Sequence, residues 1–246
     1  MTKLTFLGTG SSGGVKGVGK SRRRETSALI QTECGNVLID VTRDFAKQAR
    51  ETAGVEVVML THGHADASGG VAQLWEWMRK KGRESIFLYA ERKTIEVIKR
   101  RFARVDHLIF REIKPGKMFM VWDTEILPFR VKHALTKGFP TLGYAFKFEG
   151  KGSLAYASDV GEWDGRAEKI LSGATTLVID GAMWQKRMAA HQTIKELLPR
   201  VCRWKNKRIL FTQIGKEVPD HEEANRAIKR LCPKAGLAYD GMEVRL

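Results

Sequence analysis

Residues 55–60 read VEVVML, an apolar run interrupted only by Glu56, and this run restricts the fold more than any other stretch of the chain. Such a run is typical of a β-strand that is buried on both faces. Successive side chains of a strand point to opposite faces, so both faces of the surrounding sheet must be covered. The run therefore predicts an α/β architecture, in which helices pack on a sheet.

Other segments extend this α/β pattern over the 246 residues. Short strands are predicted at 4–10, 27–32 and 36–41 and helices at 44–52 and 69–81, from apolar alternation and helical spacing. The later predicted elements are strands at 86–89, within 108–149, and around 153–159, 176–180, 208–213 and 241–246, with helices near 95–102, 164–172, 193–204 and 222–231. No linker or repeat interrupts this order, and we expect one domain, residues 1–246, with sheets between helix layers.

The stretch THGHAD, residues 61–66, follows the buried strand and precedes a predicted helix. It places His62, His64 and Asp66 at the carboxyl end of the strand, where α/β folds build their sites. Imidazole and carboxylate ligands together suit zinc, iron or manganese. The chain has six histidines in all, so two of them beside an aspartate predict a metal site.

Six motifs resemble those of the metallo-β-lactamase-fold hydrolases, in the same order along the chain. They are LTFLGTGSSG at the start, LIDV with Asp40, THGHAD, FRVKHA with His133, AYASDVG with Asp159, and AAHQTI with His191. The opening is similar to the ribonuclease Z and phosphodiesterase branches, and the ending AYDGMEVRL to the phosphoribosyl 1,2-cyclic phosphate phosphodiesterases. The resemblance implies a four-layer αβ/βα sandwich.

The same resemblance implies a role for each matching residue. His62, His64 and His133 match the histidines of the first metal site, and Asp159 matches the aspartate that bridges two metals. His191 falls where these phosphodiesterases carry a histidine near the leaving group, and Asp40 matches a structural aspartate. Asp180 lies at the end of the predicted strand TLVID and is a further candidate for supporting the metal site, although it is part of no family motif.

Two positions depart from the family pattern, and both belong to the second metal site. Ala67 stands at the last histidine of the signature, and Gln213 at the final histidine, followed by Lys216. Asp66, Asp159 and the Gln213 amide oxygen remain there as an all-oxygen set that suits Mg²⁺ or Mn²⁺ weakly. The alternative is that the Lys216 ammonium replaces the second ion. We therefore expect one divalent metal, zinc first, with manganese or iron as alternatives.

The glycine-rich stretch GVKGVGKS, residues 14–21, fits the phosphate-binding pattern G-x-x-x-x-G-K-[ST]. A working loop of that kind follows a strand directly and opens a helix. Here TGSSG intervenes, three arginines follow, and Ala28, Leu29 and Ile30 are consecutive, as in a strand. We instead expect a loop that offers amides and positive charge to an anion. Its predicted substrate-binding residues are Lys20, Arg22, Arg23 and Arg24, joined by Lys216.

Basic residues outnumber acidic ones, 43 to 28, which gives a formal net charge of +15. A field of this sign attracts phosphorylated substrates or nucleic acid. The other interpretation is the charged surface of a thermophile, because Asn (3) and Gln (6) are scarce. The remaining histidines, His107 and His221, lie among charged residues and are predicted to be on the surface.

The three cysteines are widely spaced, which favours a reducing cytoplasm and predicts neither a disulfide framework nor a structural zinc. No apolar run approaches a membrane span and no secretory leader is expected. A homodimer is compatible with the sequence.

The function predicted from these observations is hydrolysis of a small, cyclic phosphodiester by a metal-activated water. Asp66 would orient that water, and His191 would protonate the leaving oxygen. Two alternatives stay open. One is an RNA-processing nuclease like ribonuclease Z, and the other is a catalytically impaired relative that binds nucleic acid through its positive surface.

Overall fold

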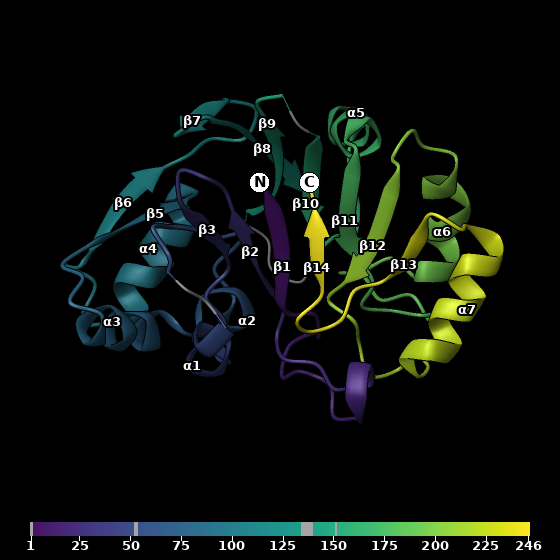
Figure 1. Cartoon of the computed structure of the whole chain (residues 1–246), viewed down its shortest axis with the longest axis horizontal. Helices are drawn as coiled ribbons and strands as arrows, with labels where there is room; N and C mark the ends of the chain where they lie inside the picture. Colours follow the sequence, from purple (N-terminus) through teal and green to yellow (C-terminus); the bar gives the residue numbers. More distant parts are fainter. Residues whose placement is uncertain (1, 52–53, 134–139, 151) are drawn as a thin grey trace.

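Two seven-stranded β-sheets lie face to face in the computed structural model, which describes residues 2–51, 54–133, 140–150 and 152–246. Helices cover the outer face of each sheet (Figure 1). The first sheet has the order β14-β1-β2-β3-β4-β5-β6, and the second the order β13-β12-β11-β10-β9-β8-β7. In each sheet, antiparallel strands pass into parallel ones partway across.

The first sheet is built from the amino-terminal part of the chain and the last strand. β14 and β1 to β3 pair antiparallel, whereas β3 to β6 pair in parallel. The strands are β1 (Lys3–Gly8), β2 (Ser27–Gln31), β3 (Asn36–Ile39), β4 (Val57–Met59), β5 (Ile86–Ala90), β6 (Leu108–Glu112) and β14 (Glu243–Arg245).

The second sheet begins as an antiparallel meander and ends in parallel strands. β7 to β10 pair antiparallel, and β10 to β13 in parallel. The strands are β7 (Phe119–Val121), β8 (Thr124–Val131), β9 (Thr141–Phe148), β10 (Ser153–Ala157), β11 (Thr176–Asp180), β12 (Arg208–Thr212) and β13 (Ala235–Leu237).

The helices form the two outer layers. The first sheet is covered by α1 to α4 and the second by α5 to α7 (Figure 1). They are α1 (Phe45–Gln48), α2 (Ala65–Ser68), α3 (Val71–Lys80), α4 (Arg92–Arg101), α5 (Gly165–Gly173), α6 (Ile194–Cys202) and α7 (His221–Leu231), with single 3₁₀ turns η1 (Gly19–Ser21) and η2 (Ala49–Glu51). None of the described helices is long and apolar enough to cross a bilayer.

Three separate apolar cores hold these four layers together. The central core lies between the sheets and contains Phe6, Tyr144 and Tyr156. A second core packs α1, α3 and α4 on the first sheet, and a third packs α5 to α7 on the other. At about 25 cal/mol per Å² of apolar surface, this burial is the main stabilising contribution. The predicted four-layer αβ/βα sandwich is confirmed.

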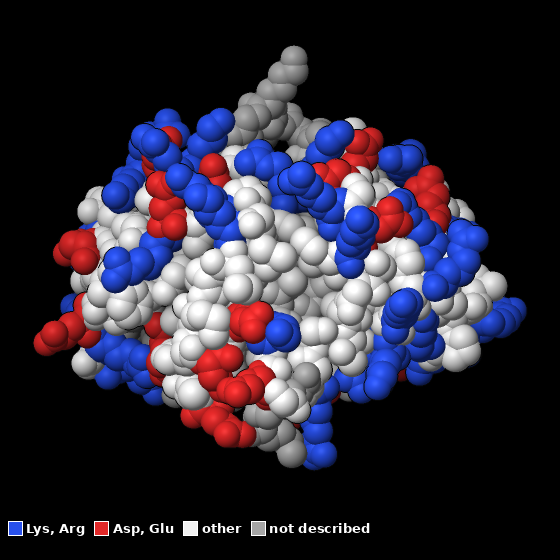
Figure 2. Space-filling view, turned by 90° about the horizontal axis from the view of Figure 1, so that it is seen from above, with Lys and Arg blue, Asp and Glu red and all other residues white. Residues whose placement is uncertain are grey.

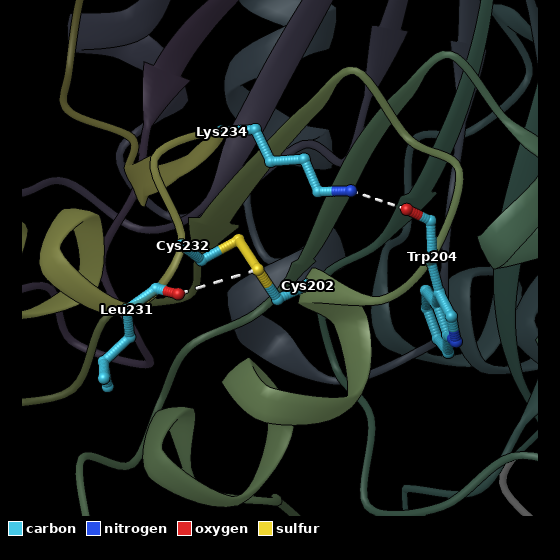
Figure 3. The surroundings of a disulfide bond; sticks show 5 residues. All are labelled: Cys202, Trp204, Leu231, Cys232 and Lys234. Carbon is cyan, nitrogen blue, oxygen red and sulfur yellow. Dashed lines mark hydrogen bonds between the residues drawn. A yellow bond between two sulfur atoms is a disulfide. The ribbon is translucent and has the colours of Figure 1, made fainter.

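A disulfide joins the ends of α6 and α7, although the wide spacing of the cysteines predicted no disulfide framework. Cys202 ends α6, Cys232 follows α7, and their sulfur atoms form a disulfide (Figure 3). Their Cα atoms are 5.7 Å apart, inside the range that a disulfide requires. Spacing along the sequence could not reveal this pair, because packing of α6 against α7 brings the residues together.

The surface placement of the two outlying histidines is wrong as well. His107 and His221 are both buried, at 8% and 2% exposure. His107 contacts the Trp75 ring, and His221 lies against Tyr239 and 3.1 Å from Arg23. Charged neighbours in the sequence suggested solvent, but adjacent residues point in different directions: Asp106 is exposed beside buried His107, and Asp220 is exposed beside buried His221.

The positive charge is dispersed on the face that Figure 2 shows, which is the upper side of the molecule in Figure 1. Lysine and arginine side chains are spread around its periphery, with acidic side chains between them and an uncharged middle. This face therefore offers no continuous basic channel for a polyanion.

Candidate metal centre

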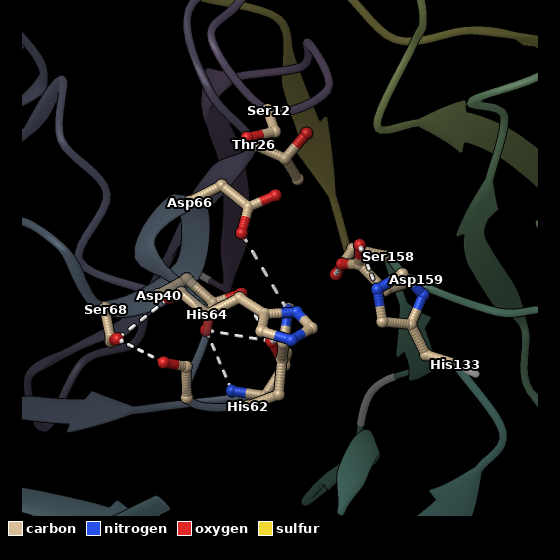
Figure 4. Close-up of polar contacts among 12 residues, drawn as sticks. Ser12, Thr26, Asp40, His62, His64, Asp66, Ser68, His133, Ser158 and Asp159 are labelled. Atoms are coloured by element: carbon tan, nitrogen blue, oxygen red, sulfur yellow. Dashed lines mark hydrogen bonds and ion pairs between the residues drawn. The ribbon is translucent and has the colours of Figure 1, made fainter. Parts of the chain in front are cut away.

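The residues of THGHAD meet partners from the second sheet at one edge of the sandwich. His62 and His64 lie in the loop that joins β4 to α2, and Asp66 is in the first turn of α2. His133 and Asp159 follow β8 and β10 of the other sheet. Figure 4 shows His62, His64 and Asp66 on one side and His133 and Asp159 facing them.

The ligand atoms are close enough to share an ion. One group consists of His62, His64 and His133, and a second of His133, Asp159 and His191; within each group the ligand atoms lie within 4.8 Å of one another. His62 Nε2 is 3.9 Å from Asp66 Oδ1, and His133 Nε2 is 4.0 Å from Asp159 Oδ1. The structure thus brings together all the histidines predicted for the first site.

Neighbouring groups fix the orientation of His62. Thr61 donates its backbone N–H and its hydroxyl to the buried carboxylate of Asp40, at 2.8 and 2.9 Å. The Thr61 oxygen is then free to accept from His62 Nδ1, 2.9 Å away. This assignment leaves the lone pair of His62 Nε2 directed at the centre. Nε2 is buried and has no hydrogen-bond partner among the described residues.

A backbone carbonyl fixes His133 in the same way. Its Nδ1 lies 3.2 Å from the oxygen of Ala190, which can only accept a hydrogen bond. The proton therefore sits on Nδ1, and Nε2 presents a lone pair. Metal-binding histidines commonly donate their other ring nitrogen to a carbonyl or carboxylate in this manner.

Burial and crowding lower the basicity of two of these histidines. Burial, reinforced by the neighbouring rings, lowers the pKa of His62 to about 4 and lowers that of His64. Burial also acts to raise the pKa of Asp159, but the adjacent histidines, His62 foremost, outweigh it and leave the pKa lowered. Neutral imidazoles beside an ionised carboxylate are the forms that bind a divalent cation.

Asp66 differs from Asp159 in its electrostatics. Burial and the charge of Asp159 raise the pKa of Asp66 to about 6. At neutral pH this carboxyl is therefore ionised, yet much more basic than an ordinary aspartate. Such a group can accept a proton from a nearby water molecule.

A hydrogen bond occupies the position where the family pattern has a second-site histidine. Gln213 directs its amide nitrogen at Asp159 Oδ1, 2.7 Å away, and Ser158 Oγ donates to the other oxygen at 2.8 Å. The amide nitrogen, and not the oxygen considered from the sequence, therefore faces the site. Ala67 is buried at 2% exposure and offers no ligand atom. Both oxygens of Asp159 thus receive protein hydrogen bonds.

His191 is paired with a buried carboxylate. Its Nδ1 is 2.6 Å from Asp180 Oδ2, at the end of β11. Asp180 also accepts from the backbone N–H groups of Val160 and Ala182, which fixes its position. Burial lowers the pKa of His191, but the charge and hydrogen bond of Asp180 outweigh this effect and raise it to about 9. Asp180, which the sequence suggested as a supporting residue, thus contacts His191 directly.

The predicted anion-binding residues separate into different places. Lys20 is 3.3 Å from Glu222 and lies over the Tyr239 ring. Arg23 is buried, donating to Thr9 Oγ1 and the Ala238 carbonyl at 2.7 and 2.6 Å. Arg22 and Arg24 border a cavity on the glycine-rich loop. Lys216 is exposed and borders a smaller cavity between that loop and residues 214–221.

Several residues that no sequence motif singled out support the centre. Thr61 and Ser158 directly precede a ligand, so their place in THGHAD and AYASDVG was a usable signal. Arg101, at the end of α4, donates to Ser68 Oγ and the Gly63 carbonyl at 3.0 and 2.9 Å. No local pattern identifies Arg101, because α4 reaches this loop only through tertiary packing.

The donor set fits a divalent metal ion. The partnerless Nε2 of His62 would be costly to bury unless an ion or another donor satisfied it. Three imidazoles with a carboxylate are typical zinc ligands, and other first-row metals use them too. A four-layer αβ/βα fold with such a cluster at the edge of its sheets defines a metal-dependent hydrolase.

The chain belongs to the β-lactamase superfamily: a family model described as "Beta-lactamase superfamily domain" matches residues 35–214. This span includes His62, His64, His133 and Asp159. No curated protein sequence matches the chain.

Solved structures agree with this assignment. A diphosphatase from the PhnP family is 29% identical with a TM-score of 0.87, and the match covers 100% of this chain and 98% of that one. Zinc-bound PqqB from Methylobacterium extorquens is 16% identical, with a TM-score of 0.82 and coverage of 99% and 100%. The short form of human tRNase Z is 16% identical, with a TM-score of 0.76 and coverage of 99% and 98%.

Proposed function

We propose that this protein hydrolyses a phosphodiester in a small phosphorylated molecule, with one divalent metal held by His62, His64, His133 and Asp159. The convergence of His62, His64 and His133, with Asp159 4.0 Å from His133, carries the proposal. A divalent ion there would neutralise phosphate charge and lower the pKa of water. Zinc suits the imidazole-rich set, and manganese or iron are alternatives.

Asp66 and His191 supply opposite proton-transfer roles in this proposal. The carboxylate of Asp66, with its pKa raised to about 6, accepts the proton of the attacking water as the new P–O bond forms. His191, with its pKa raised to about 9, is protonated at neutral pH and donates from Nε2 to the leaving oxygen as the old P–O bond breaks. Two groups whose environments push their pKa values apart are suited to base and acid roles.

Gln213 and several basic residues, Lys216 among them, complete the proposed site. The Gln213 amide hydrogen bond to Asp159 partly takes the place of a second cation by stabilising the carboxylate charge. Lys216 lies three residues after Gln213 in the sequence and borders a cavity on the glycine-rich loop. It is proposed to attract the phosphate, with Lys20 and Arg22 to Arg24 adding positive potential. Arg23, being buried among its own partners, would act by positioning the loop.

A phosphoanhydride is the second candidate for the bond that is cleaved. The 29% likeness to a diphosphatase favours it, and attack at phosphorus would use the same residues. An RNA substrate has weaker support, since the likeness to tRNase Z is 16% in sequence and extends to the fold only.

The test begins with metal content and then measures turnover. Untagged protein purified without chelators should contain about one equivalent of zinc, manganese or iron by elemental mass spectrometry. His64→Ala should lose the ion, whereas His107→Gln, which removes a buried histidine outside the centre, should retain it. Each protein is then assayed on a cyclic phosphodiester, a nucleoside diphosphate and a structured RNA.

Hydrolysis of either small substrate, lost in His64→Ala and kept in His107→Gln, would support the proposal. If RNA is the only substrate that is cleaved, the protein is a nuclease and the proposed small-molecule substrate is wrong. A folded protein that stays metal-free after soaking and binds RNA with a steep salt dependence would instead identify a non-catalytic relative.

A further inference from the structure

The glycine-rich loop that imitates a nucleotide-binding sequence borders a cavity of about 830 Å³. Residues 11–18 form no helix, and only the 3₁₀ turn η1 follows them, so the loop is not the helix-opening phosphate loop of nucleotide hydrolases. The cavity lies between this loop, α1 and Asp240. It includes none of the proposed metal ligands.

Basic side chains dominate the cavity wall. Its lining contains six lysines and arginines but two acidic residues, Asp44 and Asp240. Asp44 pairs with Lys47 at 3.0 Å, and Asp240 pairs with Arg24 at 3.2 Å. These two pairs leave the remaining positive charge of the cavity uncompensated by protein carboxylates.

Three of the basic side chains have no protein partner. The side chains of Lys16, Arg22 and Arg50 make no hydrogen bond or ion pair with any described residue, although all three residues line the cavity. A phosphate monoester carries a charge of about −1.5 to −2 at neutral pH. Balancing three free cations therefore takes an anion with at least two phosphate groups.

The glycines of the loop leave room for an anion beside the basic side chains. Gly13 and Gly19 have φ of 82° and 55°, and a Cβ at either position would point into open space. The N–H groups of Gly13, Gly14 and Val15 donate to Glu25, Ser11 and Arg23, so the side chains of the lining, and not the loop amides, are available to an anion. The lining offers no aromatic ring and a single large apolar side chain, Val15. The cavity is therefore built for charge and not for a nucleobase.

Buried hydrogen bonds hold the wall in place before any ligand arrives. Glu25 is 1% exposed and accepts from the Gly13 N–H at 2.8 Å and from the Arg43 guanidinium. The Glu25 N–H in turn donates to Asp44 at 3.1 Å. On the other side of the loop, the Arg23 guanidinium donates hydrogen bonds to Thr9 Oγ1 and to the Ala238 carbonyl. A wall fixed in this way loses little conformational entropy when it binds an anion.

We propose that this cavity is a second, metal-independent binding site for an anion that carries two or more phosphate groups, held by Lys16, Arg22 and Arg50. The ligand is either a free oligophosphate or the diphosphate group of a larger polar molecule. This site goes beyond the proposed hydrolysis, because its lining contains no proposed metal ligand and binding does not require the ion. Arg22, to which the proposed hydrolysis gives only a long-range electrostatic effect, would contact the anion here.

The test is isothermal titration of inorganic tripolyphosphate into protein stripped of metal by a chelator. We expect one equivalent to bind, more tightly than orthophosphate. The double variant Arg22→Ser with Arg50→Ser should weaken binding at least about 30-fold, since each charge-assisted hydrogen bond contributes a factor of ten or more. Arg130→Ser with Arg166→Ser removes the same charge from exposed positions elsewhere and should change the affinity less than about threefold.

Equal weakening in the two double variants would overturn the proposal, because it would reveal attraction by net charge alone. Absence of binding, or binding that appears only after metal is restored, would overturn it as well. If the first double variant fails to fold, Lys16→Gln in the same loop should still weaken binding about tenfold, and an unchanged affinity would refute the site. A sugar-linked diphosphate that binds more tightly than tripolyphosphate would identify a larger polar ligand, and the reverse order a free oligophosphate.

Discussion

The pair formed by His191 and Asp180 allows a quantitative prediction about proton transfer. Burial lowers the pKa of His191, but Asp180 foremost, together with Asp159 and Asp66, outweighs burial and raises that pKa from its ordinary value of 6.5 to about 9. At about 1.36 kcal/mol per pH unit, this difference corresponds to roughly 3 kcal/mol favouring the protonated ring. Burial raises the pKa of Asp180 itself, so part of the gain is offset by the cost of burying that carboxylate. The figure is therefore an upper limit.

Asp180→Asn removes the charge but keeps the size of the side chain. We expect the pKa of His191 to fall by about two pH units or more, because burial then acts without its counterweight. The measurement is a proton NMR titration of the histidine Cε1 signals in metal-free protein, with Asp123→Asn as the control. The alkaline limb of kcat/KM should move from near pH 9 toward neutral pH in the variant.

The same pair determines how stability depends on pH. The folded-state pKa of His191 is raised, so its contribution is fully present below pH 6.5 and is lost as pH rises through about 9. Urea unfolding of the wild type should show this loss, and Asp180→Asn should not. A His191 pKa that is unchanged in the variant, or an alkaline limb that does not move, would refute the assigned role of Asp180.

Three further predictions concern other parts of the molecule. The double variant Cys202→Ser with Cys232→Ser removes the disulfide and should lower the free energy of unfolding by roughly 3–4 kcal/mol, given a sequence separation of 30. Urea unfolding measures this loss, and the wild type in reductant should be as stable as the variant. Ala67→His with Gln213→His should recruit a second metal equivalent by elemental mass spectrometry, and a count that stays near one would contradict the account of the lost ligands. Removing the metal with a chelator should lower the Tm. The bound ion contributes about 4 kcal/mol to the free energy of unfolding when its concentration is 1,000 times its Kd. A Tm that does not change would show that no ion is bound to the folded protein.

Local sequence determined the architecture and the first set of candidate ligands. The buried strand at 55–60 indicates a sheet that is covered on both faces. The motif THGHAD follows it directly in the chain, so its side chains must lie at the carboxyl end of that strand. His133 and Asp159 also follow strands directly. Their position was therefore predictable once the order of strands and motifs matched a known fold.

Tertiary packing alone decided how the remaining side chains are used. Arg23 lies between two partly exposed arginines, and only the neighbouring Thr9 and Ala238 explain why it turns inward. The disulfide needs α6 and α7 side by side, and the Asp180 bond to His191 needs the loop after β11 to fold back. Such contacts join residues that are distant in the chain, and their energy depends on burial and direction, which a linear sequence does not contain.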